Sequence, residues 1–157
     1  MKKKILIFIV TYKASFRLLN LIQKIPYKKL SKYNYTIYIS DDHSEDLVSF
    51  KYIKLVKNQY GSKLKINYNK KNLGYGGNIK KCINYAFKKN FNYAIMLHGD
   101  NQYNPKYISN MLKLISKTNY DAIVGSRMKK KGSALKGNMP FYKYIGNMVL
   151  SKYFNIF

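Results

Sequence analysis

Acidic residues are scarce in this sequence. Its 157 residues include 30 Lys and Arg but only 6 Asp and Glu, which gives a formal net charge of +24. Four of these acids lie in residues 41–46, and the other two are Asp100 and Asp121. Acids scattered at random over a surface would not cluster in this way. Residues 41–46 and Asp100 are therefore the first candidates for a functional site.

Cysteine and long apolar runs are also rare. The single cysteine, Cys82, excludes an internal disulfide framework and suits a reducing compartment. No signal peptide is predicted at the N-terminus, and no uninterrupted apolar run approaches the ~20 residues that a membrane-spanning helix needs. We therefore expect one domain in the cytoplasm, either free or in peripheral contact with the cytoplasmic face of a membrane.

Arginine is nearly absent, because only Arg17 and Arg127 accompany the lysines. Lysines that neutralise phosphates bind nucleic acid in a salt-dependent way, but arginine is the usual reader of bases. The lysines also accompany abundant Asn, Ile, Tyr and Phe, as a coding bias would produce. We expect nonspecific attraction to anionic surfaces, membranes included, and no specific nucleic-acid binding.

Short apolar runs alternate with helical periods along the chain. The runs predict strands at residues 5–10, 35–39, 64–68, 93–97 and 122–124. Apolar spacings of three and four predict helices at residues 18–25, 79–87 and 108–115, and a less regular helix near Glu45. Asn104 and Pro105 suit the start of the third helix. This alternation predicts an α/β fold, with a mostly parallel sheet and helices on both faces.

The polar segments that follow the predicted strands should meet, because open parallel sheets bind ligands beyond the carboxyl ends of their strands. These segments are Thr11 and Tyr12, Asp41 and Asp42, residues 72–78, residues 98–102 and residues 125–127. All five are expected at one edge of the sheet.

Asp100 and Gln102 offer oxygen ligands for a hard divalent cation. Mg²⁺ and Mn²⁺ keep several waters and are often bound by one carboxylate plus ligand phosphates, so a single aspartate is sufficient. The neighbouring His98 either supplies a nitrogen ligand or only forms hydrogen bonds at the end of its strand. A plain turn would also account for Asp100.

Asp41 and Asp42 offer carboxylates that can accept the ring N–H of a base or a ribose hydroxyl. The acids that follow them are also explained by a helix start, where negative charge meets the positive end of the dipole. Gly74 belongs to "NLGYGGN", whose glycines permit close approach of a phosphate or ribose, although the spacing is not that of a dinucleotide fingerprint. Arg127 is either a donor fork for a diphosphate or a surface arginine.

Five stretches, in this order, resemble the N-terminal part of a family 2 glycosyltransferase of the GT-A fold, and are most similar to the dolichol- or polyprenyl-phosphate hexosyltransferases. They are "IFIVTYKA", "YISDDHSED", "NLGYGGNIKKCINYA", "MLHGDNQYNP" and "IVGSRM" followed by "MPFYKYIGNMVLS". The resemblance covers nearly the whole chain. It implies a single GT-A domain over residues 1–157, dependent on Mg²⁺ or Mn²⁺. This domain would move a hexose from UDP-hexose or GDP-hexose to a lipid phosphate or a glycan.

The resemblance also implies roles for individual residues. Thr11, Tyr12, Asp41 and Asp42 would hold the nucleotide, and Arg127 would lie by the diphosphate or the sugar. Asp100 would take the place of the second aspartate of the Asp-x-Asp metal motif, with Gln102 beside it. His98 stands where the first of those aspartates is usual, and Lys13 replaces an asparagine that is common after the first strand.

The C-terminal stretch, residues 138–157, is aromatic and interrupted by Lys143 and Lys152, and it predicts an amphipathic helix. Such a helix would pack on a further part of the protein or lie on a membrane surface. Relatives continue into an acceptor region, which this chain is expected to lack. The alternative to an active enzyme is therefore a nucleotide-sugar-binding or assembly module that does not turn over.

Overall fold

The computed structural model describes residues 2–126, 132–137 and 139–154. The chain consists of two compact units, Met1–Thr118 and Asn119–Phe157. A single functional domain over residues 1–157 stays a prediction.

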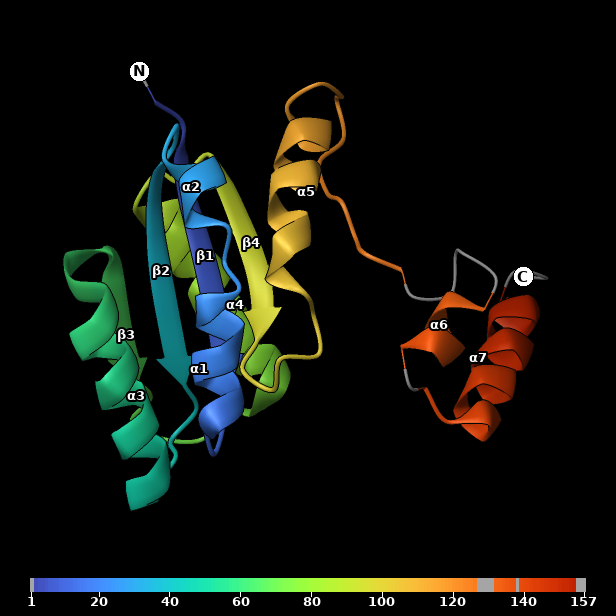
Figure 1. The fold of residues 1–157 in the computed structure, drawn as a ribbon, viewed down its shortest axis with the longest axis horizontal. Helices are drawn as coiled ribbons and strands as arrows, with labels where there is room; N and C mark the ends of the chain where they lie inside the picture. The colour runs from blue at the N-terminus through green and yellow to red at the C-terminus, as the bar shows by residue number, and fades with distance from the viewer. Residues whose placement is uncertain (1, 127–131, 138, 155–157) are drawn as a thin grey trace. The chain divides into compact units, whose positions relative to one another are not determined.

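The first unit is built on four parallel strands in the order β3-β2-β1-β4 (Figure 1). The strands are β1 (Lys4–Thr11), β2 (Asn34–Asp41), β3 (Leu64–Tyr68) and β4 (Tyr93–His98). Thr11 pairs with Asp41, and Val10 pairs with His98, so the carboxyl ends of three adjacent strands lie level. Four of the five predicted strands are therefore confirmed, and the polar segments that follow them share one edge.

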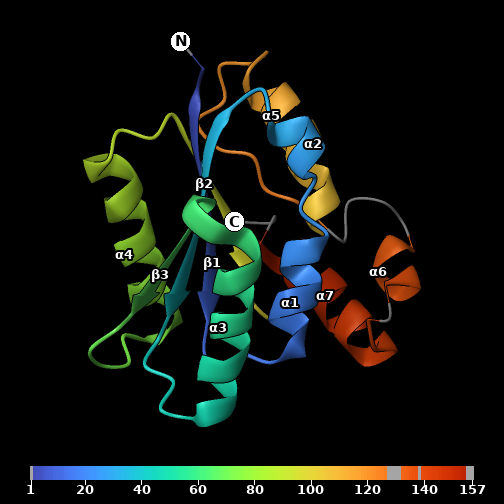
Figure 2. The ribbon, with the colours of Figure 1, turned by 60° about the vertical axis from the view of Figure 1, so that its left-hand side comes forward.

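Helices cover both faces of the sheet, as predicted (Figure 2). One face carries α1 (Phe16–Gln23), α2 (Tyr27–Leu30), α3 (Leu47–Tyr60) and α5 (Ile108–Ile115), and the other carries α4 (Gly74–Lys88). Alternate residues of β1 serve the two faces: Ile7 belongs to the larger core, and Phe8 packs with Cys82 of α4. This double burial explains why β1 is continuously apolar.

Two short 3-10 helices complete the first unit, η1 (Gly61–Lys63) before β3 and η2 (Pro105–Tyr107) before α5. The side chain of Asn104 accepts a hydrogen bond from the Lys106 N–H at 3.1 Å, and Pro105 follows as the first residue of η2. The predicted start of this helical segment is thereby confirmed.

The predicted fifth strand, residues 122–124, is wrong, because this segment has no regular structure. Val124 is 87 % exposed. A run of three apolar residues has little tendency to form a strand unless it pairs with a neighbour and packs on a core.

The second unit contains α6 (Ser133–Lys136) and α7 (Phe141–Phe154). No residue of α7 is buried within this unit, and its large apolar side chains are exposed. Lys143 and Lys152 are nine positions apart, which places them on opposite sides of a helix with 3.6 residues per turn. Throughout residues 2–126, 132–137 and 139–154, we find no helix with the length and apolar character needed to cross a bilayer.

Candidate functional site

A cavity of about 490 Å³ opens at the carboxyl edge of the sheet. It lies where the strand order reverses, between the ends of β1 and β4, which is the position at which open α/β sheets bind ligands. Six of the predicted site residues line it: Thr11, Tyr12, Asp42, Gly74, His98 and Asp100. The structure thus brings together candidates from four separate loops.

A close approach of β4 to β1 forms the floor of this cavity. The Gly99 N–H donates to the Val10 carbonyl at 3.0 Å, which continues the pairing past the end of β4. A Cβ atom at Gly99 would lie 2.8 Å from Thr11 Oγ1 and 2.9 Å from Thr11 Cβ. Glycine is therefore required here, because any side chain would displace Thr11 from the cavity wall.

Asp42 is held at the wall of the cavity by three hydrogen bonds. Its Oδ1 accepts from Asn69 Nδ2 at 2.8 Å and from the Leu73 N–H at 2.9 Å. Its own N–H donates to the Thr11 carbonyl at 2.9 Å. Because the residue is only 4 % exposed, the carboxylate is a fixed acceptor for an N–H or hydroxyl group of a ligand.

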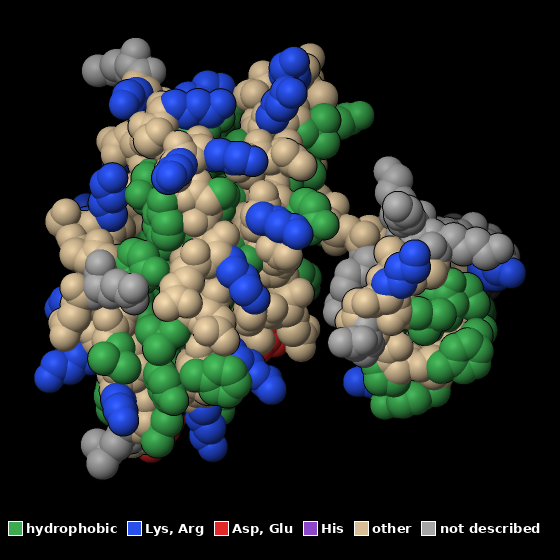
Figure 3. Space-filling model, in the orientation of Figure 1, with side chains coloured by type: hydrophobic (Ala, Val, Ile, Leu, Met, Phe, Trp, Pro, Cys, Tyr) green, Lys and Arg blue, Asp and Glu red, His purple; other side chains and the backbone are tan. Residues whose placement is uncertain are grey.

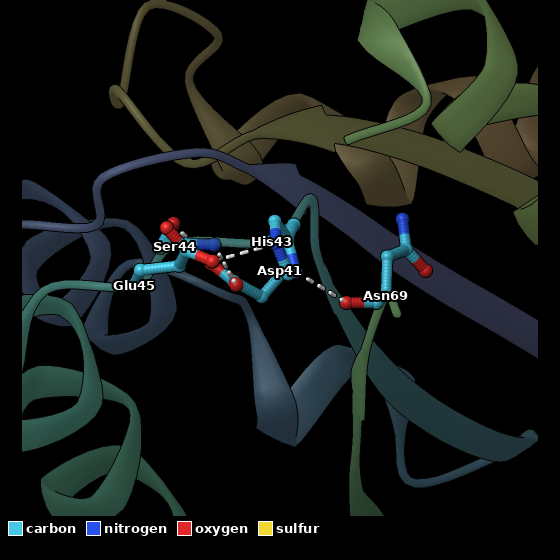
Figure 4. Close-up of polar contacts among 5 residues, drawn as sticks. All are labelled: Asp41, His43, Ser44, Glu45 and Asn69. Carbon is cyan, nitrogen blue, oxygen red and sulfur yellow. Dashed lines mark hydrogen bonds and ion pairs between the residues drawn. The ribbon is translucent and has the colours of Figure 1, made fainter. Parts of the chain in front are cut away.

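Asp41 does not line the cavity. Its carboxylate is fully buried, and it accepts hydrogen bonds from Ser44 N–H at 2.8 Å and Ser44 Oγ at 2.7 Å (Figure 4). Burial raises the pKa of Asp41, and the Ser44 hydrogen bonds oppose that rise. We conclude that Asp41 shapes the turn that presents Asp42.

The same turn contains His43, whose backbone adopts a left-handed conformation with φ 64°. Its Nδ1 lies 3.1 Å from the Asn69 carbonyl, and its Nε2 lies 2.8 Å from a carboxylate oxygen of Glu45. The contact with Asn69 joins the β2 turn to the segment after β3, whereas the contact with Glu45 lies within the turn (Figure 4).

A buried polar network, which the sequence alone did not identify, supports Asp42. Ser40 Oγ donates to Asn78 Oδ1 at 2.6 Å, and Asn78 Nδ2 donates to the Ser40 carbonyl at 3.0 Å. Asn69 Nδ2 also reaches Asn78 Oδ1, at 3.2 Å. The available signal was Asn78 itself, since it lies four residues before Cys82 on the buried side of α4.

Asp100 is exposed at the mouth of the cavity. Its Oδ1 accepts a hydrogen bond from the Gln102 N–H at 3.0 Å, in a turn where Asn101 has φ 63°. The Gln102 side chain does not line the cavity. The turn interpretation of Asp100 is therefore correct for the backbone, and it leaves the carboxylate accessible to a ligand.

His98 contacts two tyrosines beside Asp100. Its Nε2 lies 2.9 Å from the hydroxyl of Tyr75. Its ring packs edge to face against the ring of Tyr103, with 4.7 Å between the ring centroids. Burial lowers the pKa of His98, and the charge of Asp100 opposes this. The neutral imidazole is favoured, with one ring nitrogen already engaged.

The donor set at this edge can hold a hard cation only together with a ligand. Within the described ranges no group of three or more His, Cys, Asp or Glu side chains comes together as a metal cage. Mg²⁺ and Mn²⁺ fit a site with one carboxylate and ligand phosphates, which is what Asp100 offers. Arg127, the other predicted catalytic residue, lies outside the described residues.

Two cationic residues that were not predicted as ligands, Lys13 and Arg17, also line the cavity. The signals were present in the sequence: Arg17 is one of only two arginines, and Lys13 stands at a position where the resembling family has asparagine.

The parallel sheet, covered by helices on both faces, has the GT-A type of α/β fold. The family model described as glycosyl transferase family 2 matches residues 6–152, and the chain belongs to this family. The uncharacterized protein MJ0544 of Methanocaldococcus jannaschii is 33 % identical over 129 residues, which cover 79 % of this chain and 51 % of the relative.

Solved structures of S. aureus TarS share the fold. The structure of TarS residues 1–349 is 20 % identical, with a TM-score of 0.54, and the match covers 83 % of this chain and 40 % of that one. Its complexes with UDP and with UDP-GlcNAc match with TM-scores of 0.55 and 0.53, at 20 % and 19 % identity. The match to the UDP complex covers 83 % of this chain and 40 % of that one, and the match to the UDP-GlcNAc complex covers 83 % and 39 %. The chain therefore spans about half the length of the curated relative, and less of TarS.

Proposed function

We propose that this protein is a glycosyltransferase that binds a nucleoside-diphosphate hexose in the cavity at the end of β1 and β4. One observation carries the proposal: Asp42 and Asp100, which come from different strands in a chain with 6 acids, line the same cavity. UDP-hexose is the first candidate donor, since TarS was solved with UDP and UDP-GlcNAc, and GDP-hexose is the alternative.

Asp42, Tyr12 and Thr11 are suited to the nucleoside. Asp42 can accept the ring N–H of a base or a ribose hydroxyl, because an ionised carboxylate has only acceptor positions. Tyr12 is 52 % exposed and offers an aromatic face for stacking. Thr11 adds a hydroxyl beside them, and Gly74 leaves room for the ligand at the start of α4.

Asp100 is suited to the diphosphate end. It would hold Mg²⁺ or Mn²⁺ together with the phosphates, with His98 and Gln102 as the further candidate ligands. Such an ion stabilises negative charge on a departing diphosphate. The acceptor oxygen attacks the anomeric carbon, and the bond from that carbon to the diphosphate oxygen breaks. The configuration at the anomeric carbon is thereby inverted.

The acceptor decides whether a general base is needed. A lipid phosphate, as used by the dolichol- and polyprenyl-phosphate hexosyltransferases, is already a nucleophile. A glycan hydroxyl would instead require a carboxylate base. We favour a lipid phosphate at a membrane surface, because the two carboxylates described in the lining are both assigned to binding.

That same observation favours a second candidate, a nucleotide-sugar-binding module that does not turn the donor over. Incubation with radiolabelled UDP-hexose, with and without acceptor lipids, separates the two. Transfer or hydrolysis by this chain rejects the module, whereas donor binding without either supports it.

Thermal unfolding with a panel of UDP-sugars and GDP-sugars tests the proposal, because a ligand that binds only the folded state raises the melting temperature. We expect a UDP-sugar to stabilise the protein, and Mn²⁺ to increase that effect. Asp100→Asn should remove the Mn²⁺ increment, while Asp121→Asn, an exposed acid outside the cavity, should keep it. A panel without any stabilising nucleotide sugar would contradict the proposal.

A further inference from the structure

Two cations line the β1 side of the cavity without a described acidic partner. Lys13 follows β1 directly, and Arg17 lies in the first turn of α1. Among the residues that the structure describes, the single ion pair joins His43 to Glu45. Lys13 Nζ also lies 5.4 Å from the centroid of the Tyr12 ring, a contact that does not neutralise its charge. The charges of both residues are therefore available to a ligand in the cavity.

The backbone of Lys13 is held in an uncommon conformation. Its φ of 52° is left-handed, which is unfavourable for a residue with a side chain. Its N–H donates to Ser44 Oγ at 2.7 Å, and that hydroxyl donates to buried Asp41 at 2.7 Å. Residues held in such conformations are enriched at ligand sites, and Lys13 also lines the cavity.

The environment of Lys13 contains one further acid, Asp46. Hydrogen bonds from Ser49, and to a smaller extent the charge of Lys13, hold the pKa of Asp46 below its usual range. Because Asp46 N-caps α3 through those Ser49 contacts, its carboxylate is already engaged.

Arg17 is placed where its charge does not help its own helix. The first turn of α1 contains no acid, and a cation there opposes the positive end of the helix dipole. Ser15 caps this end by accepting from the Arg17 N–H at 3.3 Å. An anion bound in the cavity would make this arrangement favourable, because it would interact with both the positive end of the helix dipole and the guanidinium.

We infer that Lys13 and Arg17 bind the diphosphate of the donor. This inference rests on the proposed function and adds two protein cations to it. The guanidinium fork matches a pair of phosphate oxygens, and the lysine adds a point charge from the loop. The two cations would then stabilise part of the negative charge that develops on the leaving nucleoside diphosphate.

The role of Lys13 and Arg17 is tested by comparing the binding of uridine and of UDP to the whole protein. Both affinities are measured by calorimetry and ligand-observed NMR in the presence of EDTA. The variant is Lys13→Asn with Arg17→Gln; asparagine tolerates left-handed backbone and glutamine keeps the helix. The control is Lys28→Gln with Lys29→Gln, which removes the same charge from α2, outside the cavity. Thermal melting shows whether each protein is folded.

The double variant should bind UDP at least about tenfold more weakly, because charge-assisted hydrogen bonds are lost, and bind uridine as the wild type does. The α2 control should leave both affinities unchanged. Unchanged UDP binding, an equal loss for uridine, or an equal loss in the α2 control would each overturn the inference. If the double variant does not fold, Arg17→Gln alone is judged by the same UDP-to-uridine comparison. A wild type that binds neither ligand would instead reject the proposed function.

Discussion

Adjacent aspartates at the end of β2 have different surroundings. Asp42 lines the cavity, whereas Asp41 is fully buried and is satisfied by Ser44. The alternation of side chains along an extended strand explains the difference, because consecutive residues point in opposite directions. Asp42 is thereby suited to ligand binding and Asp41 to shaping the turn.

Asp41 should make stability depend on pH. Its pKa is raised by burial, so the folded state binds more protons than the unfolded state between the ordinary aspartate pKa of about 3.9 and the folded value. The free energy of unfolding therefore falls as pH rises through that window. Urea unfolding of the wild type and Asp41→Asn should show the wild type losing stability relative to the variant from about pH 4 upward. Parallel curves would show that the carboxyl group is not perturbed.

Gly99→Ala should damage the floor of the cavity. The new methyl group would meet Thr11 Oγ1 at 2.8 Å, and relieving that overlap should cost about 1–3 kcal/mol of unfolding free energy and weaken UDP binding. Gly76→Ala is the matched control, since a Cβ there has no neighbour within 4 Å. Equal stability of the two variants in urea unfolding would contradict the close packing of β4 against β1.

The sequence was sufficient to predict that Asp42 and Asp100 lie at one cavity, because acids are so rare in this chain that their positions carry information. It did not reveal that Asp41 is buried outside the cavity lining, which depends on the direction in which its side chain leaves β2. Nor did it assign Lys13 or Arg17. A single lysine has no compositional contrast among 30 basic residues, and the rarity of Arg17 did not show that the first turn of α1 faces the cavity.

At the scale of elements, α4 is fastened to the sheet by a polar contact at its N-terminal end and by apolar packing further along. Asn78 bonds to Ser40 there, while Cys82 and Ala86 pack on β1 and β2. The polar end holds Leu73 and Gly74 at the cavity, where the Leu73 N–H fixes Asp42. This contact therefore serves the site as well as the fold.

Asn78→Ala should destabilise the protein by about 1–3 kcal/mol, because it leaves buried hydrogen-bonding groups of Ser40 and Asn69 without that partner. Asn84→Ala, an exposed change on the same helix, should alter stability by less than about 0.5 kcal/mol. Urea unfolding measures both. A similar effect of the two substitutions would show that the network contributes nothing.

The elements that the sequence predicted correctly are those with strong local patterns and full burial. β1 has a continuous apolar run and the centre of β2 is mostly apolar, because helices cover both faces of these strands. The helical periods match α1, α4 and α5. The run at 122–124 has a similar composition but no strand partner, so tertiary context decided against it.

At the scale of the whole molecule, the net charge of +24 governs encounters with anionic surfaces. Basic side chains are spread over the visible face of residues 1–118, while the few visible carboxylates lie toward the lower end, where the strands end (Figure 3). In the sequence, five of the six acids stand at or just after the carboxyl ends of β2 and β4: Asp41, Asp42, Glu45, Asp46 and Asp100.

Binding to vesicles should be electrostatic. In flotation assays, anionic phosphatidylserine vesicles should capture the protein at low salt, and neutral phosphatidylcholine vesicles should not. Screening at about 0.5 M salt should release it. Binding that persists there would show that apolar side chains, such as those exposed on α7, insert into the bilayer.

Calorimetric titration of UDP tests the central claim most directly, because the whole account depends on one cavity at the end of β1 binding a nucleotide through Asp42. The wild type should bind UDP, and Asp42→Asn should bind it about tenfold to a hundredfold more weakly, through loss of a hydrogen bond to a charged acceptor. UDP binding that is absent from the wild type, or equal in the two proteins, would contradict the account.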